Sequence, residues 1–152
     1  MQRRGRPIDN VFAPTETLYH RMNKQSFERG QTAGQFLIKF PMPDTSVNRS
    51  KPDGQPADVL LERWPQYEQW GIVAFEVRQI PTPDVTPERA ATYYKVQHDP
   101  IDHNYYHSEI RAFRDRGCTR RIKTLNKKGR TWFRVELSQR LNEANIIKEP
   151  EI

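Results

Sequence analysis

WGIVAFEVRQI, residues 70–80, is the stretch that decides the fold class. Its side chains alternate, so that Val73, Phe75 and Val77 face one way and charged residues face the other. Alternation with a period of two is typical of a β-strand that buries one side. The stretch therefore predicts a strand, and a sheet built around it is the frame for interpreting the rest of the chain.

Three more strands are predicted downstream: SEIRAF at 108–113, TRRIKTL at 119–125 and RTWFRVEL at 130–137. TYYKVQ, before them, also has strand character. The connections RDRGC and NKKG are short, and the second offers a glycine where a hairpin often needs a positive φ. Strands joined by such short turns must pair antiparallel.

The helical signals are shorter than the strand signals. ETLYHRMNKQSFE, from residue 16 onward, has loosely helical spacing, and ADVLLERW at 57–64 resembles a short helix that Pro65 ends. Another short helix is predicted to begin at Thr86 and Pro87, where Thr86 would supply the capping oxygen and Pro87 would occupy the first helical position. These signals predict two or three short helices.

The remaining upstream segments are a strand and a loop. GQFLIKF alternates Phe36, Ile38 and Phe40 on one side, which predicts a strand. Residues 41–56 are polar and rich in turn formers, so a long loop is expected there.

The 152 residues fit one domain, and with 35% hydrophobic and 29% charged residues its core should be modest. We expect a flexible basic leader over 1–15, a single domain over 16–140 and a C-terminal tail over 141–152. The predicted fold class is α+β, a mostly antiparallel β-sheet with two or three short helices and a long polar loop.

Cys118 is the single cysteine, so no disulfide can form within the chain, which fits a reducing compartment. The arginines around Cys118 would lower the pKa of its thiol if it is exposed. No apolar run approaches the roughly 18 residues that a membrane span needs, and the N-terminus lacks the apolar segment of a signal peptide. A cytoplasmic protein without a membrane partner is expected.

The net charge of +6 is unevenly placed. Residues 111–130 hold nine Lys or Arg and a single acid, whereas residues 7–110 are net negative. If the strands at 119–125 and 130–137 pair, cations lie beside an outward-facing tryptophan, which suits phosphate binding with base stacking. The residues predicted to bind nucleic acid are Arg120, Arg121, Lys123, Lys127, Lys128, Arg130, Trp132 and Arg134. An acidic protein partner or a merely solvated sheet face are the alternatives.

HDPIDHNYYHSEI, which begins at His98, contains three of the four histidines. If it is extended, alternation places His103, His107 and Glu109 on one face, where they could ligate a divalent metal or act as an acid–base pair. The alternative is a polar turn that hydrogen bonds of His98 and Asn104 shape. No cofactor is predicted. If this face were catalytic, a divalent metal is the ion that it could hold.

Three blocks of the chain, SVNRSKPDGQPADVLLE, WGIVAFEV and YYKVQHDPIDHNYYHSEI, resemble a group of small bacterial hypothetical proteins. That group shares an SVxRS segment running into DVL and a later HDP segment followed by Asn and His. The resemblance covers residues 17–112 and implies no activity. If the first and third blocks meet in space, Arg49 could bind an anion beside His107; otherwise Arg49 is an ordinary surface residue.

Three functional hypotheses follow. The leading one is a small cytoplasmic binding protein that recognises a polyanion, nucleic acid above all, through C-terminal basic strands. The alternative is a metal- or histidine-dependent, nuclease-like hydrolase in which His103, His107 and Glu109 are catalytic. The third is a protein–protein adaptor in a larger bacterial system. The sequence contains no P-loop, Rossmann glycine pattern, G-x-S-x-G or H-E-x-x-H motif that would indicate another enzyme class.

Overall fold

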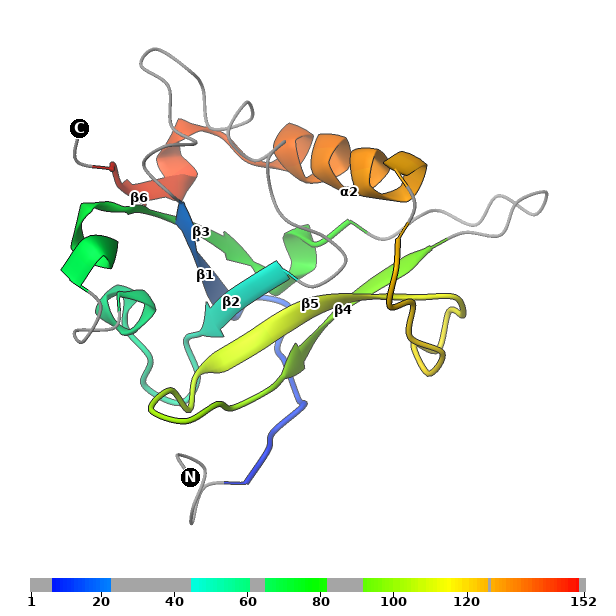
Figure 1. Cartoon of the computed structure of the whole chain (residues 1–152), viewed down its shortest axis with the longest axis horizontal. Helices are drawn as coiled ribbons and strands as arrows, with labels where there is room; N and C mark the ends of the chain where they lie inside the picture. The colour runs from blue at the N-terminus through cyan, green and yellow to red at the C-terminus, as the bar shows by residue number, and fades with distance from the viewer. Residues whose placement is uncertain (1–6, 23–44, 61–64, 82–91, 126, 151–152) are drawn as a thin grey trace.

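A computed structural model describes residues 7–22, 45–60, 65–81, 92–125 and 127–150. Within them, six strands form one sheet in the order β4-β5-β2-β1-β3-β6, and every neighbouring pair is antiparallel (Figure 1). The strands are β1 (Thr17–Met22), β2 (Thr45–Arg49), β3 (Gly71–Glu76), β4 (Tyr93–His98), β5 (His107–Phe113) and β6 (Ile146–Lys148). The helix α2 (Lys127–Arg140) lies along one side of this sheet.

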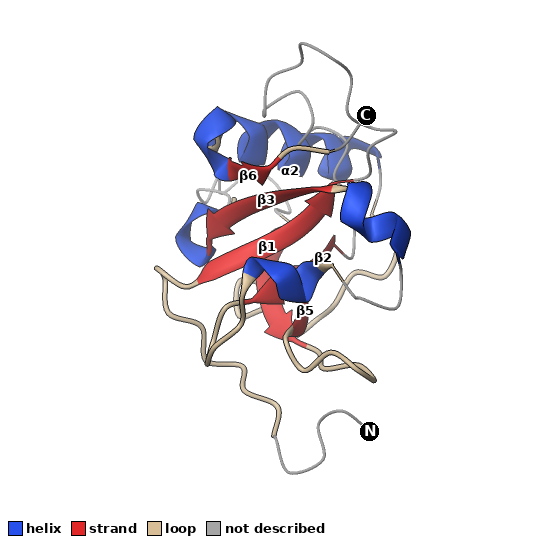
Figure 2. Ribbon diagram, turned by 90° about the vertical axis from the view of Figure 1, so that its left-hand side faces the viewer, coloured by secondary structure: helices blue, strands red, loops and turns tan. Residues whose placement is uncertain are grey.

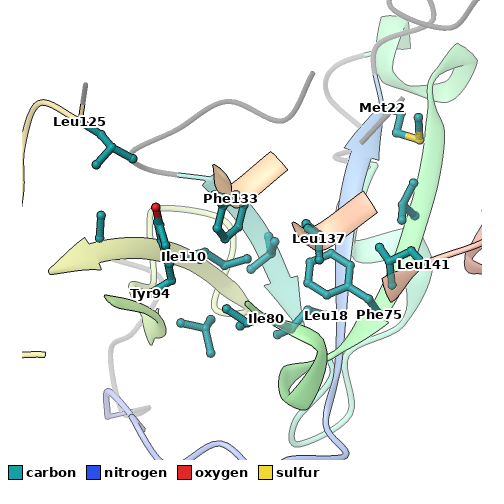
Figure 3. Close-up of a cluster of buried hydrophobic side chains, with 14 of the residues drawn as sticks. Leu18, Met22, Phe75, Ile80, Tyr94, Ile110, Leu125, Phe133, Leu137 and Leu141 are labelled. Atoms are coloured by element: carbon teal, nitrogen blue, oxygen red, sulfur yellow. The ribbon is translucent and has the colours of Figure 1, made fainter. Parts of the chain in front are cut away.

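The core lies between α2 and the sheet (Figure 3). Phe133 and Leu137 are one helical turn apart and fully buried, so they lie on the same stripe of α2. Each such side chain stabilises the fold by about 1.5–3 kcal/mol when it is fully buried. The hydroxyl of Tyr94 on β4 donates to the carbonyl of Gly129 at 3.0 Å, which ties the start of the helix to the sheet.

Each strand presents one face to this core and the other away from it. The helix face carries Leu18, Val47, Val73, Phe75, Tyr94, Val96 and Ile110, which all belong to the core cluster. The opposite face, here called the polar face, carries Ser46, Asn48, Gln97, His107, Glu109 and Arg111. The described residues also form two 3-10 helices near these strands, Pro56–Val59 and Pro65–Gln69. The first is joined to β2 by a hydrogen bond that Asn48 donates to the carbonyl of Asp58 at 2.7 Å.

The prediction of a mostly antiparallel sheet is confirmed, but the described residues contain one α-helix rather than two or three. The stretch at 70–80 forms β3 as far as Glu76 and then turns into a 3-10 helix, Val77–Gln79. The strand signals of TYYKVQ and SEIRAF are confirmed by β4 and β5.

The predicted strand at 130–137 is wrong, because these residues belong to α2. Phe133, Val135 and Leu137 alternate as in a strand, yet the first and last also fit one helical stripe, and Val135 remains 38% exposed. The strand predicted at 119–125 is wrong as well. Those residues form bends with a single bridge, Phe113 to Arg121, and are anchored by the buried Ile122 and Leu125.

Other predicted elements also differ. The helix expected from residue 16 is the strand β1, since six residues there pair with β3. The long polar loop at 41–56 contains β2, whose buried Thr45 and Val47 face the core. Of the helix at 57–64, the structure describes only the 3-10 turn that ends at Val59. The strand around Phe36 and the helix start at Thr86 lie outside the described residues.

The segments near the two ends of the chain join the fold. The segment 7–16 runs across one end of the sheet, where Tyr105 donates to the carbonyl of Pro7 at 2.8 Å. At the other end β6 extends the sheet beyond β3 (Figure 2), and Asn145 donates to the carbonyl of Ala74 at 2.8 Å. In the described part of the chain, no helix is long and apolar enough to cross a membrane.

Candidate functional site

The two blocks that the resemblance brings into focus do meet, because β2 pairs with β5. Ser46 lies opposite Glu109, and Asn48 lies opposite His107. Since side chains alternate along a strand, Arg49 points to the helix face while Asn48 shares the polar face with His107. Arg49 and His107 therefore belong to two different polar clusters on opposite faces of the sheet.

The polar-face cluster consists of Asp99, His107, Glu109 and Arg111. One oxygen of each carboxylate and one ring nitrogen of His107 all lie within 4.8 Å of one another. The hairpin of β4 and β5 creates this grouping, because its register places Asp99 next to His107 and Gln97 opposite Glu109. All three donors are partly exposed, so the cluster is accessible from one side.

The ring of His107 is held by a backbone carbonyl. Its Nδ1 lies 2.8 Å from the carbonyl oxygen of Asp99, and because a carbonyl only accepts, Nδ1 must carry a proton and donate. The Nε2 atom then faces Ser46, whose Oγ lies 3.3 Å away. A ring fixed through Nδ1 presents Nε2 as the nitrogen that exchanges protons.

Two guanidinium groups accompany the carboxylates. Arg111 lies 3.2 Å from Asp99 and 3.3 Å from Glu109, and it donates to Gln97 at 3.0 Å. Arg121 approaches Glu109 to 3.9 Å. The two positive charges balance the two carboxylates, so a divalent cation at this place would have to displace both guanidinium groups. The charge balance of the cluster thus favours acid–base chemistry over metal binding.

The structure brings together two of the three predicted catalytic residues, His107 and Glu109. His103 is not one of the three grouped donors: it lies in the turn before β5 with a φ of 68°, so the expected alternation from 103 to 109 does not hold. Asp99 takes its place in the group. The sequence signal for Asp99 was the hairpin of β4 and β5, whose register carries residue 99 back beside residue 107.

The buried cluster, Glu16, Arg49 and His98, lies on the helix face. The guanidinium of Arg49 is 1% exposed and donates twice to the carboxylate of Glu16, from Nε and Nη2, both at 2.9 Å. It also donates to the carbonyls of Asp9 and Val11. Arg49 is therefore no surface residue, and the anion that it binds is the internal carboxylate of Glu16.

His98 and Asn104 shape the turn between β4 and β5, as predicted. Nδ1 of His98 accepts from the backbone N–H of Asp9 at 2.9 Å, and Nε2 donates to the carbonyl of Tyr105 at 2.7 Å. Asn104 donates to the side chain of Asn48 at 3.0 Å. Burial lowers the pKa of His98 below its usual value, so the neutral ring is the form that fits these bonds.

Beyond β5 lies the basic segment, defined here as residues 114–125 with Lys127 and Lys128. Its first part is a compact loop, in which Asp115 accepts from the backbone N–H groups of Thr119 at 3.0 Å and Arg120 at 2.7 Å. The hydroxyl of Thr119 and these backbone groups lower the pKa of Asp115 to about 2. Of the predicted nucleic-acid ligands, the exposed ones are Arg120, Arg121, Lys123, Lys127 and Lys128.

The other predicted ligands are less available. Arg130 is half-buried and donates to the carbonyl of Leu125 at 2.6 Å. Trp132 stacks on Tyr94 with ring centroids 5.7 Å apart, so one of its faces is already covered. Trp132 and the half-buried Arg134 do not share a face as predicted, because two residues along a helix turn through about 200°.

Cys118 is not the activated thiol that its arginine neighbours indicated. Its side chain is half-buried, and desolvation raises the pKa of the thiol above its usual value. Lys95 lowers that pKa by a smaller amount, which burial outweighs.

No protein-family model, curated protein or solved structure matches the chain.

Proposed function

We propose that this protein binds a polyanion, nucleic acid above all, and that the basic segment makes the contacts. One observation carries the proposal. Six exposed cations of this segment form no ion pair with an acidic side chain among the described residues. They are Arg114, Arg116, Arg120, Lys123, Lys127 and Lys128.

Of the four exposed cations in the described residues outside this segment, Lys95 on β4 also forms no ion pair, but the other three do. Lys51, Arg78 and Arg140 each pair with a carboxylate. A phosphate that binds an unpaired cation displaces only counterions, whereas a phosphate that binds a paired cation must also break an internal ion pair. The basic segment is therefore a better phosphate-binding surface than the paired cations. The hydrogen bonds of Asp115 hold the loop in shape before binding, which reduces the entropy lost on association.

The test is the salt dependence of binding to labelled single-stranded RNA and DNA. The slope of log K against log salt is negative, and the variant Arg114→Gln/Arg116→Gln/Arg120→Gln should make it shallower by about 2. The reason is that each phosphate contact on a single strand contributes about 0.7 to the steepness of the slope. Absence of binding at low salt, or affinity that does not fall as salt rises, would contradict the proposal.

A matched control separates local contacts from overall charge. The variant Lys51→Gln/Arg78→Gln/Arg140→Gln removes the same three charges from cations that already have partners. It should leave the slope nearly unchanged. If both triple variants weaken binding equally, net charge rather than the basic segment governs the affinity.

A further inference from the structure

The polar-face cluster adjoins the basic segment and holds groups that binding alone does not need. Arg121 belongs to the basic segment and reaches Glu109 on β5. Ile122 donates its backbone N–H to the carbonyl of Ala112 at 2.8 Å, so the segment folds back along the end of β5. A strand of nucleic acid held by the basic segment would therefore pass next to His107 and Glu109.

We infer that the polar-face cluster cleaves RNA without a metal ion, by transferring the phosphoryl group to the adjacent 2′-hydroxyl. The inference rests on the proposed binding of nucleic acid. Three kinds of group are needed for this reaction: a base for the hydroxyl, an acid for the leaving oxygen and cations for the phosphate. The cluster supplies all three from neighbouring positions.

Glu109 is the general base. Its carboxylate removes the proton from the 2′-hydroxyl, and O2′ then attacks phosphorus while the bond from phosphorus to O5′ breaks. Arg111 donates to this carboxylate at 3.3 Å and to Gln97 at 3.0 Å, so the oxygen is fixed in place. Arg111 is therefore a positioning residue.

His107 is the general acid. As an imidazolium it gives the Nε2 proton to O5′, which leaves as a hydroxyl on the shortened strand. The carbonyl of Asp99 keeps Nδ1–H engaged throughout, so Nε2 is the atom that loses the proton. The products are a 2′,3′-cyclic phosphate and a 5′-hydroxyl, and no further reactant is consumed.

Arg121 is the phosphate ligand at the cluster. Its side chain is 36% exposed, about twice as much as that of Arg111, and it lies 3.9 Å from Glu109. A guanidinium here stabilises the charge that builds up on the phosphate oxygens during attack. DNA lacks the 2′-hydroxyl that Glu109 would activate, so RNA is the substrate class that the cluster fits.

The experiment is a single-turnover assay with end-labelled RNA in EDTA. The matched substrate carries 2′-O-methyl groups and cannot form the cyclic phosphate. We expect cleavage of the RNA alone, with product masses that correspond to a cyclic phosphate end. Cleavage of the methylated strand, or a requirement for added Mg²⁺, would overturn the inference.

Variants assign the activity to the cluster. His107→Asn and Glu109→Gln preserve the approximate shape, and each should reduce the cleavage rate about 10²–10⁴-fold. Two control variants should retain the rate. His103→Asn changes a turn histidine to a residue that tolerates a positive φ, and Glu136→Gln removes a carboxylate on α2. Unfolding curves of all four show whether each variant is folded.

The failure of this inference differs from failure of the proposed binding. RNA that is bound by the basic segment but stays intact would overturn the cleavage inference and leave the binding proposal standing. Cleavage that persists in the arginine triple variant with unchanged salt dependence would overturn the role of the basic segment instead. A preparation that neither binds nor cleaves RNA would overturn both.

Discussion

The two faces of the sheet carry the same side-chain chemistry in different settings. The buried cluster combines an arginine, a glutamate and a histidine, namely Arg49, Glu16 and His98. The polar-face cluster repeats these three types and adds an aspartate. Only the surroundings differ, so residue type by itself does not determine which cluster is buried and which is partly exposed.

In the buried cluster the polar atoms are engaged within the fold. Four N–H groups of Arg49 reach Glu16 and two backbone carbonyls, and both ring nitrogens of His98 have backbone partners. The segment 9–16 supplies most of these groups and closes that end of the core. In the polar-face cluster, by contrast, Nε2 of His107 has a long contact of 3.3 Å and Asp99 is 41% exposed. A buried cluster whose polar atoms are all hydrogen-bonded stabilises the fold, whereas a partly exposed cluster keeps some of its polar atoms accessible from the solvent.

The largest effect should come from Arg49→Met. The substitution leaves the carboxylate of Glu16 buried without its partner and deprives the carbonyls of Asp9 and Val11 of a donor. We expect the free energy of unfolding to fall by about 3–5 kcal/mol in urea denaturation. If the loss were below about 1 kcal/mol, the buried cluster would not be the structural one.

The double variant Glu16→Leu/Arg49→Met is the control for this prediction. It removes both charges, so no uncompensated carboxylate remains in the core, and it should recover part of the stability that Arg49→Met loses. No recovery would mean that lost packing, such as the contact of Arg49 with the ring of Phe12, dominates over charge.

An intermediate effect is expected from acid. Because burial lowers the pKa of His98, and desolvation lowers that of His20 to about 4, the unfolded state binds more protons than the folded state below about pH 6.5. The free energy of unfolding should therefore decrease as the pH falls from 6.5 toward 4, by at most about 1.4 kcal/mol per pH unit for each proton. Protonated His98 would also lose the acceptor for the N–H of Asp9.

His98→Gln tests this assignment, since the amide can donate and accept but does not titrate. Its unfolding free energy, measured by denaturant titration between pH 4.5 and 7, should depend less steeply on pH than that of the unmodified protein. Equal slopes would assign the pH dependence to His20 or other groups.

The sequence predicted an antiparallel sheet, but it did not predict correctly which segments form all of its strands. Alternation in β3, β4 and β5 was readable because each strand buries one side. It misled at Phe133 and Leu137, whose spacing of four satisfies a helix as well as a strand, and only packing against Tyr94 and Ile110 decides between them. The strand β2 was hidden in a polar stretch because part of what it buries is polar, Arg49 above all.

Part of the candidate site was also predictable. The pairing of His107 with Glu109 follows from the period of two along a strand. Asp99 depends on the register between β4 and β5, and Arg111 on its reach across that hairpin, neither of which local spacing shows. The partner of Arg49 lies 33 residues away in the sequence, so no local pattern could identify Glu16.

The smallest effect on stability should come from His107→Asn, the substitution that abolishes the acid in the inferred cleavage. His107 is half-buried and near the surface, and its loss removes one bond to the carbonyl of Asp99 and a long contact to Ser46. We expect the free energy of unfolding to change by less than about 1 kcal/mol. A loss as large as that of Arg49→Met would show that both clusters are structural, because a group whose removal unfolds the sheet is engaged by the fold rather than available to a substrate. A small loss with a large fall in RNA cleavage would separate the two faces by function as well as by burial.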